Sequence, residues 1–293
     1  MTTTVRTGEL RGNSFNGKDL STPQKLMIFV LSMSLFGLSN ILVEVIPEFT
    51  IGPVEIALAY FVFIPLVLAA LFNPFWVALG APLGEIIFTD LLLGDFSGIG
   101  EIEGFIQMFL AIYIAGSLIR NPLSKAQVAF GAIMIVVIDK FLSAIVDLSK
   151  VWFGLEDAEF VEGLPESMLL IEVIGFGVDI LLSGIVFGVI PALWLVPKLY
   201  GRIEPLMGMQ PRQPGKPIQG STPGIGITVA LVFVLGAASA VFAFLEAWGA
   251  DFGAAEWEWL DTYGPAILLV PAAIFVVLLA GVFVFAGKQR KQP

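Results

Sequence analysis

Long apolar stretches recur along the whole chain, and they constrain its fold more than any motif. A helix that crosses a bilayer needs about 20 mostly apolar residues. Eight segments approach or exceed that length: 25–45, 54–72, 75–93, 104–119, 126–148, 168–196, 224–245 and 264–287. Only 14% of the 293 residues are charged, against about 25% in soluble domains. The sequence therefore predicts an all-α integral membrane protein with eight transmembrane helices in a lipid bilayer.

Two prolines bear on the shape of these helices. The segments 54–72 and 75–93 are separated only by Asn73 and Pro74. Because proline starts a helix well but cannot continue one, this spacing predicts a tight helical hairpin. Pro191 lies inside the long segment 168–196, and we expect it to kink or end that helix.

The distribution of basic residues predicts the orientation in the membrane. Cytoplasmic loops carry an excess of Lys and Arg. If the N-terminus is inside, the inner segments hold thirteen of the 15 basic residues and the outer segments are acidic. Shifting the helix count by one would break this pattern. We therefore predict a multi-pass protein of the cytoplasmic membrane with both termini in the cytoplasm.

A change in composition divides the chain into parts. The stretch 198–223 is rich in Pro, Gly and Gln and lacks apolar periodicity, so it predicts a cytoplasmic linker. A polar tail, 1–24, and a six-helix unit, 25–197, precede it. A two-helix hairpin with a basic tail, 224–293, follows it. No internal repeat is visible in the sequence, which disfavours an inverted-repeat transporter.

The residue types that are missing exclude several functions. The chain has no Cys and no His, so thiolate chemistry, zinc catalysis and a histidine base are disfavoured. It has no phosphate-binding loop of the Gly-x-x-x-x-Gly-Lys-Ser/Thr type, so any use of ATP requires a partner. The net charge of −10 disfavours nucleic acid as a partner and fits a salt-adapted organism. We expect no enzymatic activity, no metal and no cofactor.

Ionisable residues inside the predicted spans are the candidates for function. A charge near the middle of the bilayer costs about 2.5–3.5 kcal/mol on insertion scales, so it persists only if it is paired, protonated or facing a polar cavity. The segments 75–93, 126–148 and 168–196 each carry a polar stripe. We predict that the stripes converge on a ligand-binding cavity open to the outside. Its expected residues are Glu85, Asp90, Asp139, Lys140, Asp147, Glu172 and Asp179.

The balance of charge among these residues predicts the kind of ligand. Six acids accompany one lysine, and we expect Lys140 to neutralise Asp139, Asp147 or an acid on another helix. The remaining acids would favour a cation or would hold protons. A purely structural role, in which the acids bond to backbone or to each other, is the alternative.

Small residues at helical spacing predict close helix contacts. Gly80 and Gly84 form one small-xxx-small motif, and Gly184 and Gly188 form another. Pro82 lies between the first two glycines, and it frees a backbone carbonyl that could line the site.

Three motifs carry a family resemblance. Leu-Phe-Asn-Pro-Phe-Trp joins the second and third spans, Gly-Ala-Pro-Leu-Gly-Glu ends at Glu85, and Gly-Ser-Leu-Ile-Arg-Asn-Pro ends the fourth span. With these motifs, 25–197 resembles the substrate-capture subunit (S-component) of energy-coupling-factor vitamin transporters. The resemblance implies a six-helix protein that binds a vitamin-like solute from outside. It also implies a transmembrane coupling subunit and two ATPase subunits as partners, whereas the two C-terminal helices have no counterpart.

Two other functions stay open. An autonomous secondary transporter would use the acids in the middle of the membrane as proton or sodium sites. A membrane scaffold would transport nothing, and its acids would be structural.

Overall fold

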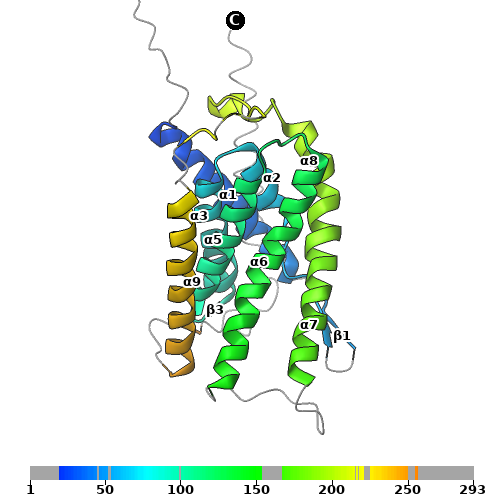
Figure 1. The fold of residues 1–293 in the computed structure, drawn as a ribbon, viewed down its shortest axis with the longest axis vertical. Coiled ribbons are helices and arrows are strands. Elements are labelled where there is room, and N and C mark those ends of the chain that lie inside the picture. Colours follow the sequence, from blue (N-terminus) through cyan, green and yellow to red (C-terminus); the bar gives the residue numbers. More distant parts are fainter. Residues whose placement is uncertain are drawn as a thin grey trace, which may run out of the picture.

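The computed structural model describes residues 20–44, 46–51, 54–98, 100–153, 167–214, 216, 218–220, 225–249 and 255–256. Six helical segments in this part of the chain are long and apolar enough to cross a membrane. They are Thr22–Glu44, Pro74–Leu93, Gly100–Leu118, Lys125–Trp152, Glu172–Leu199 and Ile227–Ala247. They run side by side along the long axis of the molecule (Figure 1). The prediction of a multi-pass α-helical membrane protein is confirmed.

The elements follow one another in a simple order. The helices are α1 (Thr22–Glu44), α2 (Phe63–Leu71), α3 (Pro74–Glu85), α4 (Leu91–Leu93), α5 (Gly100–Leu118), α6 (Lys125–Trp152), α7 (Ser167–Asp179), α8 (Ile190–Leu199) and α9 (Ile225–Ala247). Two π-helical segments, η1 (Ile86–Asp90) and η2 (Ile180–Val189), and a 3₁₀ turn, η3 (Pro205–Met207), complete them. Four short strands form two antiparallel pairs: β1 (Phe49–Ile51) with β2 (Val54–Ile56), and β3 (Asp95–Phe96) with β4 (Ala255–Glu256).

The second predicted span, 54–72, is not a continuous helix, and this prediction was wrong. Strand β2 leads into an extended segment, and helix begins only at Phe63. A helix running from residue 54 would place Pro65 in its interior, where the missing N–H and the ring clash disrupt helical hydrogen bonding. Because the helix starts at Phe63, Pro65 falls in the first turn, where its N–H is not needed. The eighth predicted span, 264–287, lies outside the described residues.

The hairpin predicted at Asn73 and Pro74 is present. Pro74 is the first residue of α3, and the Asn73 side chain accepts a hydrogen bond of 3.0 Å from the backbone N–H of Phe75. This contact caps the helix N-terminus, which otherwise has unpaired donors. The chain therefore reverses within two residues, and α3 returns along the bundle beside α1.

Glycines on α1 and α3 let these two helices touch through their backbones. A Cβ atom added at Gly84 would collide with the Met33 carbonyl group, and one added at Gly80 would collide with that of Phe29. A Cβ atom added at Gly37 of α1 would likewise collide with the carbonyl group of Gly84. The other small-xxx-small motif, Gly184 and Gly188, faces α6. A Cβ atom added at Gly188 would lie 3.3 Å from the Cβ of Ala132, and one added at Gly184 would lie 3.5 Å from a methyl group of Val136.

The sixth span continues through Pro191 instead of ending there. It runs from α7 through η2 into α8, and Pro191 lies in the first turn of α8. Wider π-helical turns re-pair backbone groups that a proline leaves without a partner. Of the two outcomes expected at Pro191, a kink or an end of the helix, the end does not occur.

The two ends of the bundle differ in charge and in packing. One end, called the basic end here, contains the start of α1, the α5–α6 connection and the end of α8. Its basic residues include Lys25, Arg120, Lys125, Lys198 and Arg202. Helix α2 lies in this half, and all its residues from Pro65 to Leu71 are buried. The basic end therefore has a solid apolar core, while the opposite, acidic end carries Glu48 in a loop and Glu101 in the first turn of α5.

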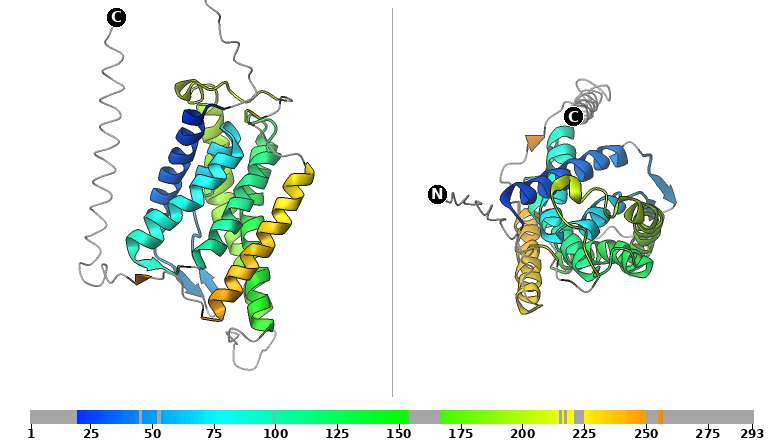
Figure 2. Two further views of the ribbon diagram at one scale, coloured as in Figure 1. Left: turned by 90° about the vertical axis from the view of Figure 1, so that its left-hand side faces the viewer. Right: turned by 90° about the horizontal axis from the view of Figure 1, so that it is seen from above.

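The segment predicted as a linker lies across the basic end (Figure 2). We call residues 200–214 and 218–220 the strap. Arg212 inserts its guanidinium beneath the strap and donates hydrogen bonds to the carbonyls of Ala69, Ala70 and Ile119. Burial lowers the pKa of Arg212 to about 10, so it remains charged at neutral pH. Helix α9, which follows the strap, packs on α5 and α6.

Candidate functional site

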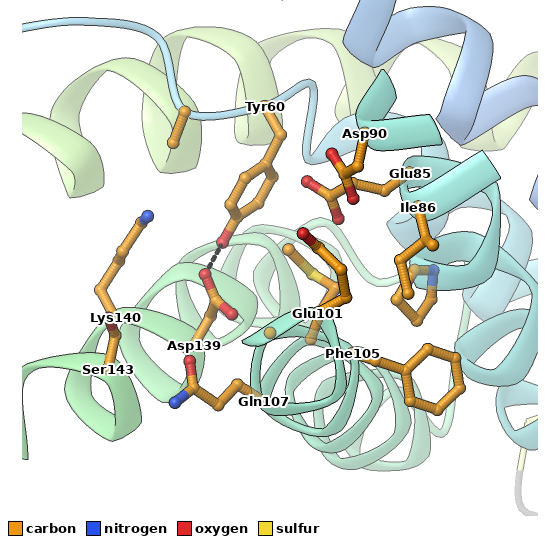
Figure 3. Close-up of a pocket in the computed structure, with 14 residues that line it drawn as sticks. Tyr60, Glu85, Ile86, Asp90, Glu101, Phe105, Gln107, Asp139, Lys140 and Ser143 are labelled. Carbon is orange, nitrogen blue, oxygen red and sulfur yellow. Dashed lines mark hydrogen bonds between the residues drawn. The ribbon is translucent and has the colours of Figure 1, made fainter. Parts of the chain in front are cut away.

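A cavity of about 290 Å³ lies in the half of the bundle toward the acidic end (Figure 3). Four pieces of the chain line it: the extended segment before α2, the end of α3 with η1, the first half of α5 and the second half of α6. Its charged residues are Glu85, Asp90, Glu101, Asp139 and Lys140. Four carboxyl groups and one ammonium therefore share one small space.

Three of the carboxyl groups gather on one side of the cavity. Glu85 ends α3, Asp90 ends η1 one turn later, and Glu101 lies in the first turn of α5. Figure 3 shows their carboxylates pointing toward the same space. We call these three residues the acid wall. A cation, above all an ammonium with several N–H donors, complements such a surface.

The fourth carboxyl group is held by a tyrosine. The Tyr60 hydroxyl donates a hydrogen bond of 2.8 Å to Oδ2 of Asp139, which is buried. The Lys140 ammonium lies 5.7 Å from the centre of the Tyr60 ring. Within the described chain, no carboxylate lies within 4.0 Å of this ammonium. The expected ion pair between Lys140 and an acid is therefore not formed there.

Four of the seven predicted ligand-binding residues line the cavity: Glu85, Asp90, Asp139 and Lys140. The other three, Asp147, Glu172 and Asp179, are not among its lining residues. Glu172 and Asp179 lie on α7 and act on Lys140 only through their charge. Their stripe faces the same region from α7, but it does not reach the cavity wall.

Asp147 belongs to a second polar cluster between α5, α6 and α9. Its Oδ1 lies 3.8 Å from Nζ of Lys150, which also lies 3.9 Å from Oε2 of Glu103. Gln107 donates to Glu103 over 2.7 Å and to the Ser239 hydroxyl of α9 over 3.3 Å. Gln107 also lines the cavity, so it connects this cluster to the candidate site.

Among the cavity residues that the sequence did not identify, three carry polar groups that bear on the site: Tyr60, Glu101 and Gln107. Tyr60 was placed on a continuous helix, and only an extended segment turns its ring toward Asp139. Glu101 was assigned to an outer loop, but α5 begins at Gly100 and brings it into the bundle. Gln107 carries no charge, so the cost of intramembrane charge did not identify it.

The backbone around the cavity departs from regular helix in three places. The segment before α2 is extended at the level of the middle of α6, and Ala59 N–H donates to the Ser183 hydroxyl over 3.2 Å. The π-helical segments η1 and η2 begin directly after Glu85 and Asp179. Non-helical backbone within a membrane protein is tolerated where protein or a cavity surrounds it, and π-helical turns are frequent at functional sites.

The lining of the cavity combines carboxyl groups with aromatic surface. Among the described residues, no three Asp or Glu side chains are positioned to hold a metal ion together. Tyr60 and Phe105 add aromatic surface to the acid wall, and an ammonium binds well near aromatic faces.

Comparisons with known proteins identify a family but no characterised relative. The comparison with curated proteins returns no match, and neither does the comparison with solved structures. The model of one family matches residues 27–293, which is most of the chain. The chain belongs to this family, which is described as a family of unknown function, DUF8171.

Proposed function

We propose that this protein captures a small amine-bearing solute in the cavity bordered by the acid wall. One observation carries the proposal: Glu85, Asp90, Glu101 and Asp139 line a single cavity, and Lys140 is the basic residue among its described lining residues. Carboxylates at this depth are costly unless a cation or protons accompany them. A bound ammonium would supply that charge and would donate several charge-assisted hydrogen bonds.

We further propose that ATP-driven partner subunits carry the captured solute across the membrane. This is how the energy-coupling-factor transporters work, and residues 25–197 resemble their S-components. One observation supports this extension: the cavity lies toward the end predicted to face outward. The vitamin-like solute of that family and its coupling subunit are expectations from the resemblance. Purification from the native membrane in mild detergent, followed by mass spectrometry, would detect such partners.

The capture proposal is tested by removing one charge from the acid wall. The purified protein in lipid nanodiscs is titrated with thiamine and with butylamine, as cationic probes, by calorimetry. Glu85→Gln should weaken binding at least about tenfold, because a charge-assisted hydrogen bond contributes about 1.5–3 kcal/mol. Glu48→Gln is the matched control, since Glu48 is exposed and lies outside the cavity. Equal affinities of wild type and Glu85→Gln for every bound probe would refute the proposal.

One observation favours a second candidate, an autonomous transporter coupled to protons or sodium. Discontinuous spans near the middle of the membrane are a recurring feature of secondary transporters, and the extended segment before α2 lines the cavity. This candidate requires that the protein alone move a solute across liposome membranes, with a dependence on pH or sodium. A captured solute that crosses only when partner proteins are present would favour the first candidate.

A further inference from the structure

We propose that the captured solute is a zwitterion: its ammonium binds the acid wall, and an anionic group at its other end binds Lys140. This inference rests on the proposed function and narrows its solute from amines in general to amino-acid-like molecules. A simple cation would leave the part of the cavity around Lys140 unused.

Lys140 occupies an unusual position for a lysine. It lies near the middle of α6, where a charge is costly unless it is paired or faces a polar cavity. Within the described residues, no ion pair involves Lys140, and its ammonium lies 5.7 Å from the centre of the Tyr60 ring. A cation–π contact at this distance is weak. The ammonium therefore keeps N–H donors for a bound anion.

Four carboxylates act on Lys140 through their charge, those of Asp139, Asp179, Glu85 and Asp147, and two of them have other partners. Asp139 accepts a hydrogen bond from Tyr60, and Asp147 accepts one from Ser143 and lies beside Lys150. Asp179 acts on Lys140 through its charge, without an ion pair between them in the structure. These acids hold a positive charge in place on α6, but none of them forms an ion pair with the ammonium.

The two kinds of charge lie on opposite sides of one ring. In Figure 3 the Lys140 ammonium lies on one side of Tyr60 and the acid wall on the other. A solute that fills both sides meets negative groups at one end and a positive group at the other. A second ammonium at the lysine end would face a like charge, and like-charge contacts are a common means of rejecting a wrong ligand.

The size of the cavity limits the class of solute further. At about 290 Å³, it lies at the small end of the range for ligand pockets, about 300–1,000 Å³. It accommodates an amino acid or an ω-amino acid, in which a short apolar chain separates the two charges. The apolar side chains of Ile86, Phe105 and Met108 also line it and can contact such a chain.

The test compares matched pairs of probes that differ by one anionic group. Wild-type protein in nanodiscs is titrated with 4-aminobutanoate and 6-aminohexanoate, and with butylamine and hexylamine. We expect at least one amino acid to bind about tenfold or more tightly than its amine, because its carboxylate gains a charge-assisted hydrogen bond. Lys140→Met should abolish that preference without weakening the binding of the amines, and Lys140→Arg should retain most of it.

Lys125→Met is the control, because it removes the same charge from an exposed position of the same helix outside the cavity. It should leave the preference for amino acids unchanged. If amines and amino acids bind the wild-type protein equally tightly, the zwitterion inference is overturned, but the proposed capture of amines still holds. This comparison uses the wild-type protein alone. A preference that survives Lys140→Met would also overturn it. Binding of neither series would refute both the inference and the proposed function.

Discussion

The hydroxyl of Tyr60 and the carboxylate of Asp139 are joined by a hydrogen bond of 2.8 Å, across 79 positions of the chain. One partner lies on the extended segment before α2, and the other lies in the middle of α6. The bond fixes the ring that separates Lys140 from the acid wall. It therefore links the break in the second span to the geometry of the cavity.

Tyr60→Phe removes this bond and keeps the ring. Asp139 is then buried without its donor, and an unsatisfied buried group costs about 1–3 kcal/mol. We expect the free energy of unfolding, measured by denaturant titration in mixed micelles, to fall by that amount. Unchanged stability of Tyr60→Phe would show that water or another donor satisfies Asp139.

Gly84→Ala should force α1 and α3 apart. The added Cβ would collide with the backbone of Met33, and overpacking of this kind costs about 1–3 kcal/mol. A lower midpoint of thermal unfolding in detergent is the expected result. Gly177→Ala, where a Cβ meets no atom within 4 Å, should cost nothing, because alanine is the better helix former. Equal melting midpoints for the two variants would contradict the close contact.

Arg212→Met should loosen the basic end of the bundle. The substitution keeps an apolar chain but leaves the carbonyls of Ala69, Ala70 and Ile119 without their donor. A loss of at least about 2 kcal/mol in unfolding free energy follows from the cost of unpaired buried groups. Arg212→Lys should recover only part of it, since one ammonium cannot reproduce the planar fork of a guanidinium. Arg202→Met is the control, because Arg202 is exposed, and a comparable loss there would contradict the assigned role of Arg212.

Glu204 makes stability depend on pH. Its carboxyl is buried next to η3 at the basic end, and burial raises its pKa because the charged form is disfavoured there. The folded state therefore loses stability as the pH rises from the unfolded pKa, about 4.3, through the raised value. Glu204→Gln should raise the melting temperature at pH 7–8 and change it little at pH 4.

Glu48→Gln, at an exposed position, serves as the reference for that pH series. Its melting temperature should match that of the wild type across the series. If Glu204→Gln instead melts below wild type at pH 8, the ionised carboxylate has a stabilising partner, and the proposed burial penalty is refuted.

The sequence alone determined the class of protein and most of its spans. Apolar length and low charge require lipid-covered helices, whatever their neighbours are. Asn73 and Pro74 determined the hairpin before α3, because capping and the missing proline N–H act locally. The cost of intramembrane charge also identified Glu85, Asp90, Asp139 and Lys140 as candidates without any knowledge of packing.

Only the tertiary structure decided which polar faces meet. Residue spacing places Asp139, Asp147 and Lys150 on α6, but the neighbouring elements decide that Lys150 also lies beside Glu103 of α5 and that Asp139 meets Tyr60. The extended backbone around Ala59 is stable because Ser183, distant in sequence, accepts its N–H. Local propensity cannot encode such long-range partners, since each polar group's cost depends on what the folded chain brings beside it.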